Sequence, residues 1–122
     1  MDNLDATINK VGFEIVETIK NKGKDKTKYK NFIDKSLGVL ANDGVYAYWV
    51  YCKANKISDV FIENMDNILK VTKDIPIQNN KNDYQKYFQD LSENLPNLLF
   101  TKELIEKALT YARYHAKAIK DE

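Results

Sequence analysis

Residues 4–21 read LDATINKVGFEIVETIKN, and their apolar periodicity indicates the class of fold to expect. The apolar side chains recur at spacings of three and four residues, at Leu4, Ile8, Val11, Ile15 and Ile19. That spacing places them on one face of an α-helix, which has about 3.6 residues per turn. The stretch therefore predicts an amphipathic helix over residues 4–21 that packs one face against the rest of the protein.

The same kind of periodicity continues along the chain. We expect further helices over residues 27–41, 45–54, 58–73 and 83–93. A last helix is predicted to begin at a Thr101 cap, with an inward face of Leu104, Ile105, Ala108, Leu109, Ala112, Ala116 and Ile119. Residues 45–54 are rich in β-branched and aromatic side chains that would also suit a strand. We favour a buried helix there, because no partner strand is visible.

Breaks in the pattern separate these helices. Gly44 is predicted to end the second helix in left-handed geometry, which glycine tolerates. Charged residues with a glycine near 22–27, and a polar stretch near 74–82, are predicted to be mobile connections. The chain thus predicts an all-α fold, a compact bundle of about five to six helices in a single domain over residues 1–122.

Composition limits the environment of the protein. Of its 122 residues, 43% are hydrophobic and 30% charged, which is typical of a folded globular chain. A single cysteine excludes an internal disulfide and favours a reducing compartment, so we expect a cytoplasmic location. The first residues lack the apolar stretch of a signal peptide, and no apolar run is long enough to span a membrane.

The sequence offers no recognisable catalytic or metal-binding motif. One histidine and one cysteine are too few for the usual zinc set of four such ligands, and the four glycines form no phosphate loop. We interpret His115 as a residue at a helix edge and Cys52 as a buried structural thiol. We therefore expect a non-catalytic protein with no catalytic residue, metal or cofactor.

Two features point to nucleic acid. Residues 20–35 hold seven lysines against Asp25 and Asp34, a local charge of +5 (7 − 2). Clustered lysines can neutralise phosphates, although they can equally form a solvated face that keeps the protein soluble. Near them in sequence lie Tyr46, Tyr48, Trp49 and Tyr51. Such rings can stack on single-stranded bases, but for Trp49 we favour packing in the core.

The same segments resemble a known family. Residues 28–35 (KYKNFIDK), the Asn42-Asp43-Gly44 stop and residues 45–53 (VYAYWVYCK) resemble the small subunit of type III-B CRISPR effector complexes, the Cmr complex. The start at Leu4-Asp5 and the ending over residues 108–114 (ALTYARY) also fit. The resemblance implies a helical, non-catalytic subunit that lines the guide–target RNA channel. It also implies partners: guide and target RNA, other effector subunits, and copies of itself in a filament.

These observations together predict an RNA-binding surface. Lysines would act as point charges on phosphates without reading bases, and the candidates in the matching segments are Lys28, Lys30, Lys35, Lys53 and Arg113. We expect these side chains to share one basic face formed by two helices. Two alternatives stay open: a small helical protein-interaction module, for example of a phage or mobile element, and an enzyme with a cleft around His115.

Overall fold

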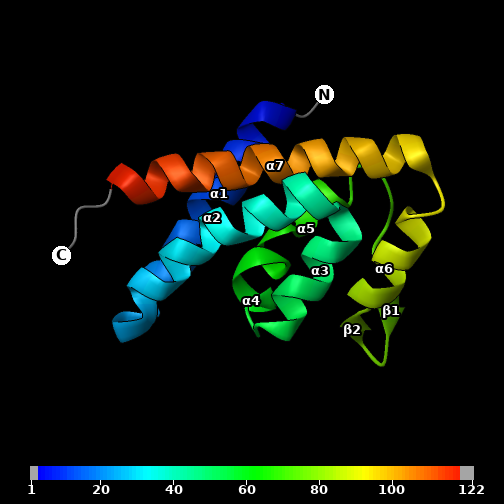
Figure 1. Ribbon diagram of the computed structural model, residues 1–122. Coiled ribbons are helices and arrows are strands. Elements are labelled where there is room, and N and C mark those ends of the chain that lie inside the picture. The colour runs from blue at the N-terminus through cyan, green and yellow to red at the C-terminus, as the bar shows by residue number, and fades with distance from the viewer. Residues whose placement is uncertain (1–2, 119–122) are drawn as a thin grey trace.

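The structure is a computed structural model that describes residues 3–118, and it is almost entirely helical (Figure 1). The all-α class predicted from sequence is confirmed. The α-helices are α1 (Leu4–Lys20), α2 (Lys26–Asp43), α3 (Val45–Ala54), α4 (Ser58–Phe61), α5 (Asp66–Leu69), α6 (Tyr84–Leu91) and α7 (Leu95–Ala118). Two short 3-10 turns, η1 (Gly23–Asp25) and η2 (Glu63–Met65), and two strands, β1 (Ile77–Gln78) and β2 (Lys81–Asn82), complete the order.

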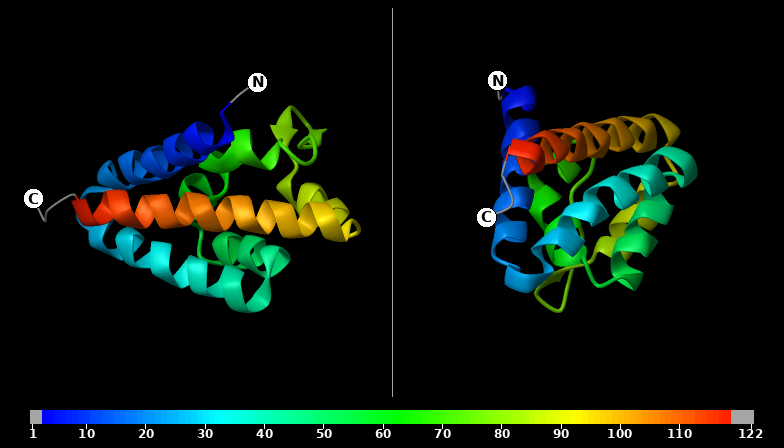
Figure 2. Two further views of the ribbon diagram at one scale, coloured as in Figure 1. Left: turned by 90° about the horizontal axis from the view of Figure 1, so that it is seen from above. Right: turned by 60° about the vertical axis from the view of Figure 1, so that its left-hand side comes forward.

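The long helix α7 organises the bundle. Seen from above, it lies between α1 on one side and α2 on the other (Figure 2). It also contacts α3, α5 and α6. Its inner face is buried at Leu104, Ile105, Ala108, Leu109, Ala112 and Ala116, as the periodicity predicted; Ile119, predicted to continue that face, lies outside the described residues. Helix α7 therefore contacts α1, α2, α3, α5 and α6, with α1 and α2 as its main neighbours.

The crossing of α1 over α7 is unusually close, and Gly12 makes it possible. A Cβ atom on Gly12 would lie 2.8 Å from Cβ of Tyr111 and 3.0 Å from the backbone oxygen of Ala108. Those distances are shorter than the usual separation of non-bonded atoms. The opposing positions on α7 are also small, at Ala108 and Ala112. The backbones of α1 and α7 therefore come into close contact at Gly12.

The single helix predicted over residues 58–73 is wrong. The chain forms α4, the turn η2 and α5 in succession, and the break lies at Ile62. Val60, Phe61 and Ile62 are consecutive and all fully buried. Successive residues on one straight helix point about 100° apart, so three in a row cannot all face one core. Breaking the helix turns each of these side chains inward.

The predicted start of the last helix at Thr101 is also wrong. Helix α7 begins at Leu95, where the Asn94 side chain accepts a hydrogen bond of 3.1 Å from the Asn97 backbone N–H. Pro96 lies in the first turn, where its missing N–H costs nothing. Thr101 instead lies buried within the helix, and its hydroxyl is hydrogen-bonded to that of Thr72 at 2.6 Å.

The connection over residues 74–82 contains a short hairpin. Ile77 pairs with Asn82 and Gln78 with Lys81, in antiparallel register. Asn79 and Asn80 form the turn, with φ of 53° and 64°, as the primed hairpin turns require. The connection over 22–27 contains η1 and the first residues of α2. The mobility predicted for both segments stays a prediction.

Within residues 3–118, none of the helices is both long and apolar enough to cross a bilayer.

The junction between α2 and α3 consists of Gly44 alone. Its φ of 95° has the positive sign predicted from sequence, whereas its ψ of −176° gives a more extended conformation than the left-handed helical one. Residues with a Cβ rarely adopt that region. We predict that Gly44→Ala lowers the free energy of unfolding by about 1–3 kcal/mol, measured by urea denaturation. A variant as stable as the parent would contradict this assignment.

Gly12→Ala tests the crossing of α1 and α7. Because the new methyl group must push the two backbones apart, we predict a loss of about 1–3 kcal/mol in the free energy of unfolding. Gly38→Ala is the matched control, since nothing lies within 4 Å of the position that its new methyl group would occupy on α2. That change should raise stability by about 0.5–1 kcal/mol, the usual gain from replacing a helical glycine. Equal effects of the two changes would argue against a close crossing.

Candidate nucleic-acid interface

Two of the predicted lysines lie together on one flank of α2. Lys28 and Lys35 are seven residues apart, about two helical turns, and therefore lie on the same side of the helix. Their ammonium groups lie 6.0 and 5.7 Å from the centre of the Phe32 ring. Neither has a carboxylate partner within residues 3–118, and both are exposed. We call this pair, with Phe32 between them, the α2 lysine stripe.

Aromatic packing holds the base of the stripe. Phe32 is buried and makes edge-to-face contacts with Tyr29, at 5.9 Å between ring centres, and with Tyr51 of α3, at 6.4 Å. The two lysines lie over a ring that is fixed in the core, and cation–π attraction favours that placement. The stripe therefore presents two positive charges from a rigid base.

The other three predicted residues lie elsewhere. Lys30 is two residues from Lys28, about 200° around α2, and so lies on the opposite flank. Arg113 of α7 forms an ion pair of 3.2 Å with Asp34 of α2, and Lys53 of α3 lies 5.7 Å from the Trp49 ring. The structure does not bring the five residues to the single basic face that the sequence predicted. Spacing along a helix cannot show which flank faces solvent.

Two lysines of the run are paired with acids. Lys20 contacts Glu17 at 3.2 Å, and Lys22 pairs with Asp59 of α4 while lying 5.0 Å from the Tyr29 ring centre. The hydrogen bond to Asp59 raises the pKa of Lys22. Lys22 thus joins the α1–α2 connection to α4.

The aromatic segment of α3 is mainly structural. Tyr48 is fully buried and donates a hydrogen bond of 2.6 Å to the Phe61 carbonyl, and burial raises its pKa. Trp49 is 6% exposed and stacks on Phe88 at 5.6 Å between ring centres. The expectation that Trp49 packs in the core is confirmed. Its indole N–H donates to Gln85, at 2.8 Å, so the polar atom is also satisfied.

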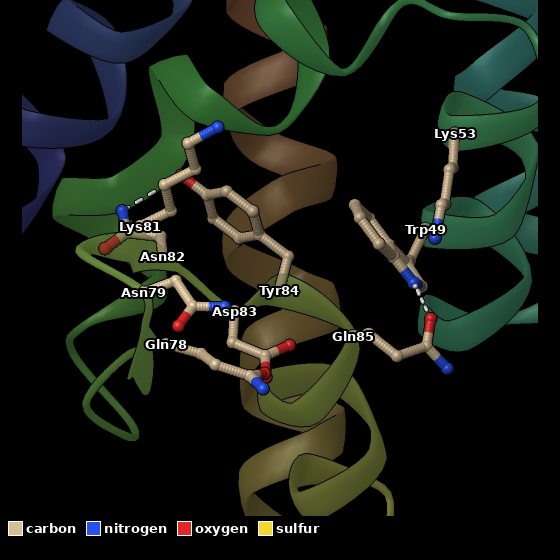
Figure 3. Close-up of a pocket in the computed structure, with 9 residues that line it drawn as sticks. All are labelled: Trp49, Lys53, Gln78, Asn79, Lys81, Asn82, Asp83, Tyr84 and Gln85. Carbon is tan, nitrogen blue, oxygen red and sulfur yellow. Dashed lines mark hydrogen bonds between the residues drawn. The ribbon is translucent and has the colours of Figure 1, made fainter.

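Beside Trp49 lies a polar hollow of about 380 Å³ between α3, the hairpin and the start of α6 (Figure 3). One wall is aromatic, from Trp49 and Tyr84. The other lining groups include Lys53 and Lys81, the carboxamides of Gln78 and Asn79, and the carboxylate of Asp83, which accepts a hydrogen bond of 3.0 Å from the Lys86 backbone N–H. Lys53 thus belongs to this hollow rather than to the α2 lysine stripe. The sequence pattern did not suggest the hollow, because its residues come from segments about 30 positions apart.

The exposed aromatic side chains are not those that the sequence suggested. Phe13 of α1 and Tyr111 and Tyr114 of α7 lie at the surface, with Tyr114 63% exposed. His115 packs edge-on against Phe13, at 5.7 Å between ring centres, and its Nε2 lies 3.1 Å from the Asn9 side-chain oxygen. In the sequence, the one signal of this exposure is that Phe13, Tyr111 and Tyr114 fall outside the apolar face of their helices.

The residues considered for chemistry lie in ordinary surroundings. Cys52 is fully buried, as predicted, and burial raises the pKa of its thiol to about 12. A thiol with that pKa stays protonated at neutral pH and is a poor nucleophile. His115 contacts Phe13 and Asn9, and neither of these residues is an acid or a nucleophile. Within the described part of the chain, no three His, Cys, Asp or Glu side chains are grouped as metal ligands.

Comparison with known proteins identifies no relative: no family model matches the sequence, and no curated protein or solved structure is significantly similar to it. Functional inference therefore depends on the residues themselves.

Trp49→Ala tests the structural role of the indole. Removing a ring that stacks on Phe88 should lower the free energy of unfolding by about 3–5 kcal/mol, measured by urea denaturation. Val50→Ala is the matched control, because the neighbouring Val50 is 46% exposed and its truncation should change stability by less than about 0.5 kcal/mol. A stable Trp49→Ala protein that loses only RNA binding would show that the ring serves binding instead.

Proposed function

We propose that this chain is a non-catalytic small subunit of a type III-B CRISPR effector complex that contacts the RNA backbone through lysines of α2. The observation that carries the proposal is the α2 lysine stripe: two exposed, acid-free ammonium groups over one fixed aromatic ring. In the proposed complex, the partners are guide and target RNA, other effector subunits, and copies of the chain in a filament.

The chemistry of the stripe suits phosphate more than bases. An ammonium group is a compact point charge, and it neutralises a phosphate without the paired hydrogen bonds that distinguish one base from another. The nearest acid on α2, Asp34, is paired with Arg113, which reduces its repulsion of an approaching phosphate. Arg113 therefore supports the stripe by neutralising Asp34, and both side chains of this pair are largely exposed.

A second candidate function is a protein-interaction module without nucleic acid. The observations in its favour are exposed apolar side chains at both ends of α7, where Leu95 is 62% exposed and Leu99 55% near the start, and Tyr114 is 63% exposed near the end. Exposed aromatic and aliphatic side chains of this kind are common in protein interfaces. In a subunit of a larger complex, the same surface would serve protein contacts while α2 faces RNA.

The salt dependence of RNA binding separates the two functions. We predict that Lys28→Gln/Lys35→Gln lowers the slope of log affinity against log salt by about 1.4, which is about 0.7 for each lost phosphate contact on a single strand. Fluorescence anisotropy with labelled single-stranded RNA, started at low salt where screening is weakest, gives the measurement. Oligonucleotides of different sequence should weaken alike, because no base contact is lost.

The matched control is Lys10→Gln/Lys70→Gln, which removes the same charge from exposed lysines of α1 and the end of α5. It should leave the slope unchanged. Adding Lys30→Gln to the stripe variant tests whether the strand also reaches the opposite flank of α2: a further fall of about 0.7 would show that it does, and an unchanged slope that it does not. Equal slopes for the stripe and control variants would reject the stripe as the RNA contact and favour the protein-interaction module.

A further inference from the structure

The hollow between α3 and the hairpin has a rigid wall and an unpaired polar rim (Figure 3). Its wall is held by hydrogen bonds on several sides. Gln85 accepts from the Trp49 indole and donates to the Tyr46 hydroxyl, which locks the indole plane. The Tyr84 hydroxyl donates to Asp66 at 2.7 Å, which holds the phenol ring toward α5. Both rings thus keep their positions without a ligand.

The rim contrasts with the wall. Lys53 of α3 lies beside Trp49 and Lys81 of β2 lies beside Tyr84, on the outer sides of the two rings (Figure 3), and no carboxylate pairs with either within residues 3–118. The Gln78 and Asn79 carboxamides, on β1 and its turn, also make no side-chain hydrogen bond there. Two cations and two carboxamides around an aromatic wall are left available to a ligand.

Within the described residues, the hollow is lined by two lysines and by one carboxylate, that of Asp83, so its balance of charge is weakly positive. Beyond Tyr84 lies a second hollow that shares Trp49, Tyr84 and Lys81 but adds the carboxylates of Glu63 and Asp66. The second hollow thus holds two carboxylates against Lys81, whereas the first holds one carboxylate against two lysines, and an anionic group is favoured in the first relative to the second. Tyr84 therefore separates a basic compartment from an acidic one.

We propose that the basic hollow binds a single nucleotide of an RNA strand. Its phosphate lies within reach of the flexible Lys53 and Lys81 side chains and away from Asp83, and its base lies against the edges of Trp49 and Tyr84, within reach of the Gln78 and Asn79 carboxamides. Carboxamides pair with base edges, aromatic rings favour bases over sugars, and lysine suits phosphate. A volume of about 380 Å³ is within the usual range for small-molecule sites. This inference depends on the proposed RNA-binding function for its ligand, but it concerns a different surface.

Trp49 provides a specific probe, because it is the one tryptophan of the chain. A base seated against it should quench its fluorescence. We predict saturable quenching on titration with AMP and with a short single-stranded RNA, and no saturable quenching with ribose 5-phosphate or inorganic phosphate. Comparing the titration with AMP and the titration with RNA shows whether the site binds a free nucleotide or a nucleotide within a strand.

Lys53→Gln/Lys81→Gln should weaken the quenching constant for AMP about tenfold, whereas the stripe variant Lys28→Gln/Lys35→Gln should leave it unchanged. All four lysines are exposed, so thermal unfolding should show that each variant is as stable as the parent. Absence of saturable quenching, equal binding of ribose 5-phosphate, or an unchanged constant in Lys53→Gln/Lys81→Gln would overturn the inference. If quenching is absent but the stripe variant still lowers the salt slope of RNA binding, the proposed function stands and the nucleotide site is rejected. If AMP quenches the fluorescence but the stripe variant leaves the salt slope unchanged, the nucleotide site stands and RNA contact through the stripe is rejected.

Discussion

The close approach of α1 to α7 at Gly12 is the constraint on which the other positions in the bundle depend. Gly12 of α1 lies against Ala108, Tyr111 and Ala112 of α7, so the two backbones approach closely and α7 is held against α1 along its inner face. Helix α2 then packs on the other side of α7, where Arg113 pairs with Asp34. The orientation of α2 decides which of its flanks meets solvent. The position of the α2 lysine stripe thus depends on the close contact between two other helices.

The aromatic residues of α3 lie mainly in the core, whereas the lysines of the α2 lysine stripe lie at the surface. Tyr48 and Trp49 of α3 are buried, and their polar atoms are satisfied by a carbonyl for Tyr48 and a carboxamide for Trp49. Satisfying these groups is necessary, because an unpaired polar atom in the core costs about 1–3 kcal/mol. The lysines of the stripe need no such partners and remain at the surface. Sequence-independent contact with phosphate requires only exposed lysines. Recognition of a base requires side chains in fixed positions, such as the aromatic wall of the hollow beside Trp49.

Most of the fold could be predicted from periodicity, and most of the site could not. Residues 4–20 and 45–54 are helical because each has an apolar pattern that one core can bury. The break at Ile62 was missed because burial of three consecutive residues depends on what surrounds them, and the start of α7 was missed because the cap is Asn94 and not Thr101. The candidate lysines were chosen from the local charge of residues 20–35 and from the segments that resemble the Cmr small subunit. Helical spacing separates Lys30 from Lys28 and Lys35 on α2, whereas the place of Lys53 beside the hollow and the pairing of Arg113 with Asp34 depend on tertiary packing.

The central claim, that RNA meets this protein along α2, is tested most directly by mapping the contact on the isolated protein. Backbone amide shifts in a two-dimensional NMR titration with single-stranded RNA at low salt report each residue separately. The account predicts that the largest shifts lie at residues 24–35 and at Tyr51, which contacts Phe32 beneath the stripe. Shifts confined to the exposed apolar residues of α7, such as Leu99 and Tyr114, or no saturable shifts at all, would contradict it.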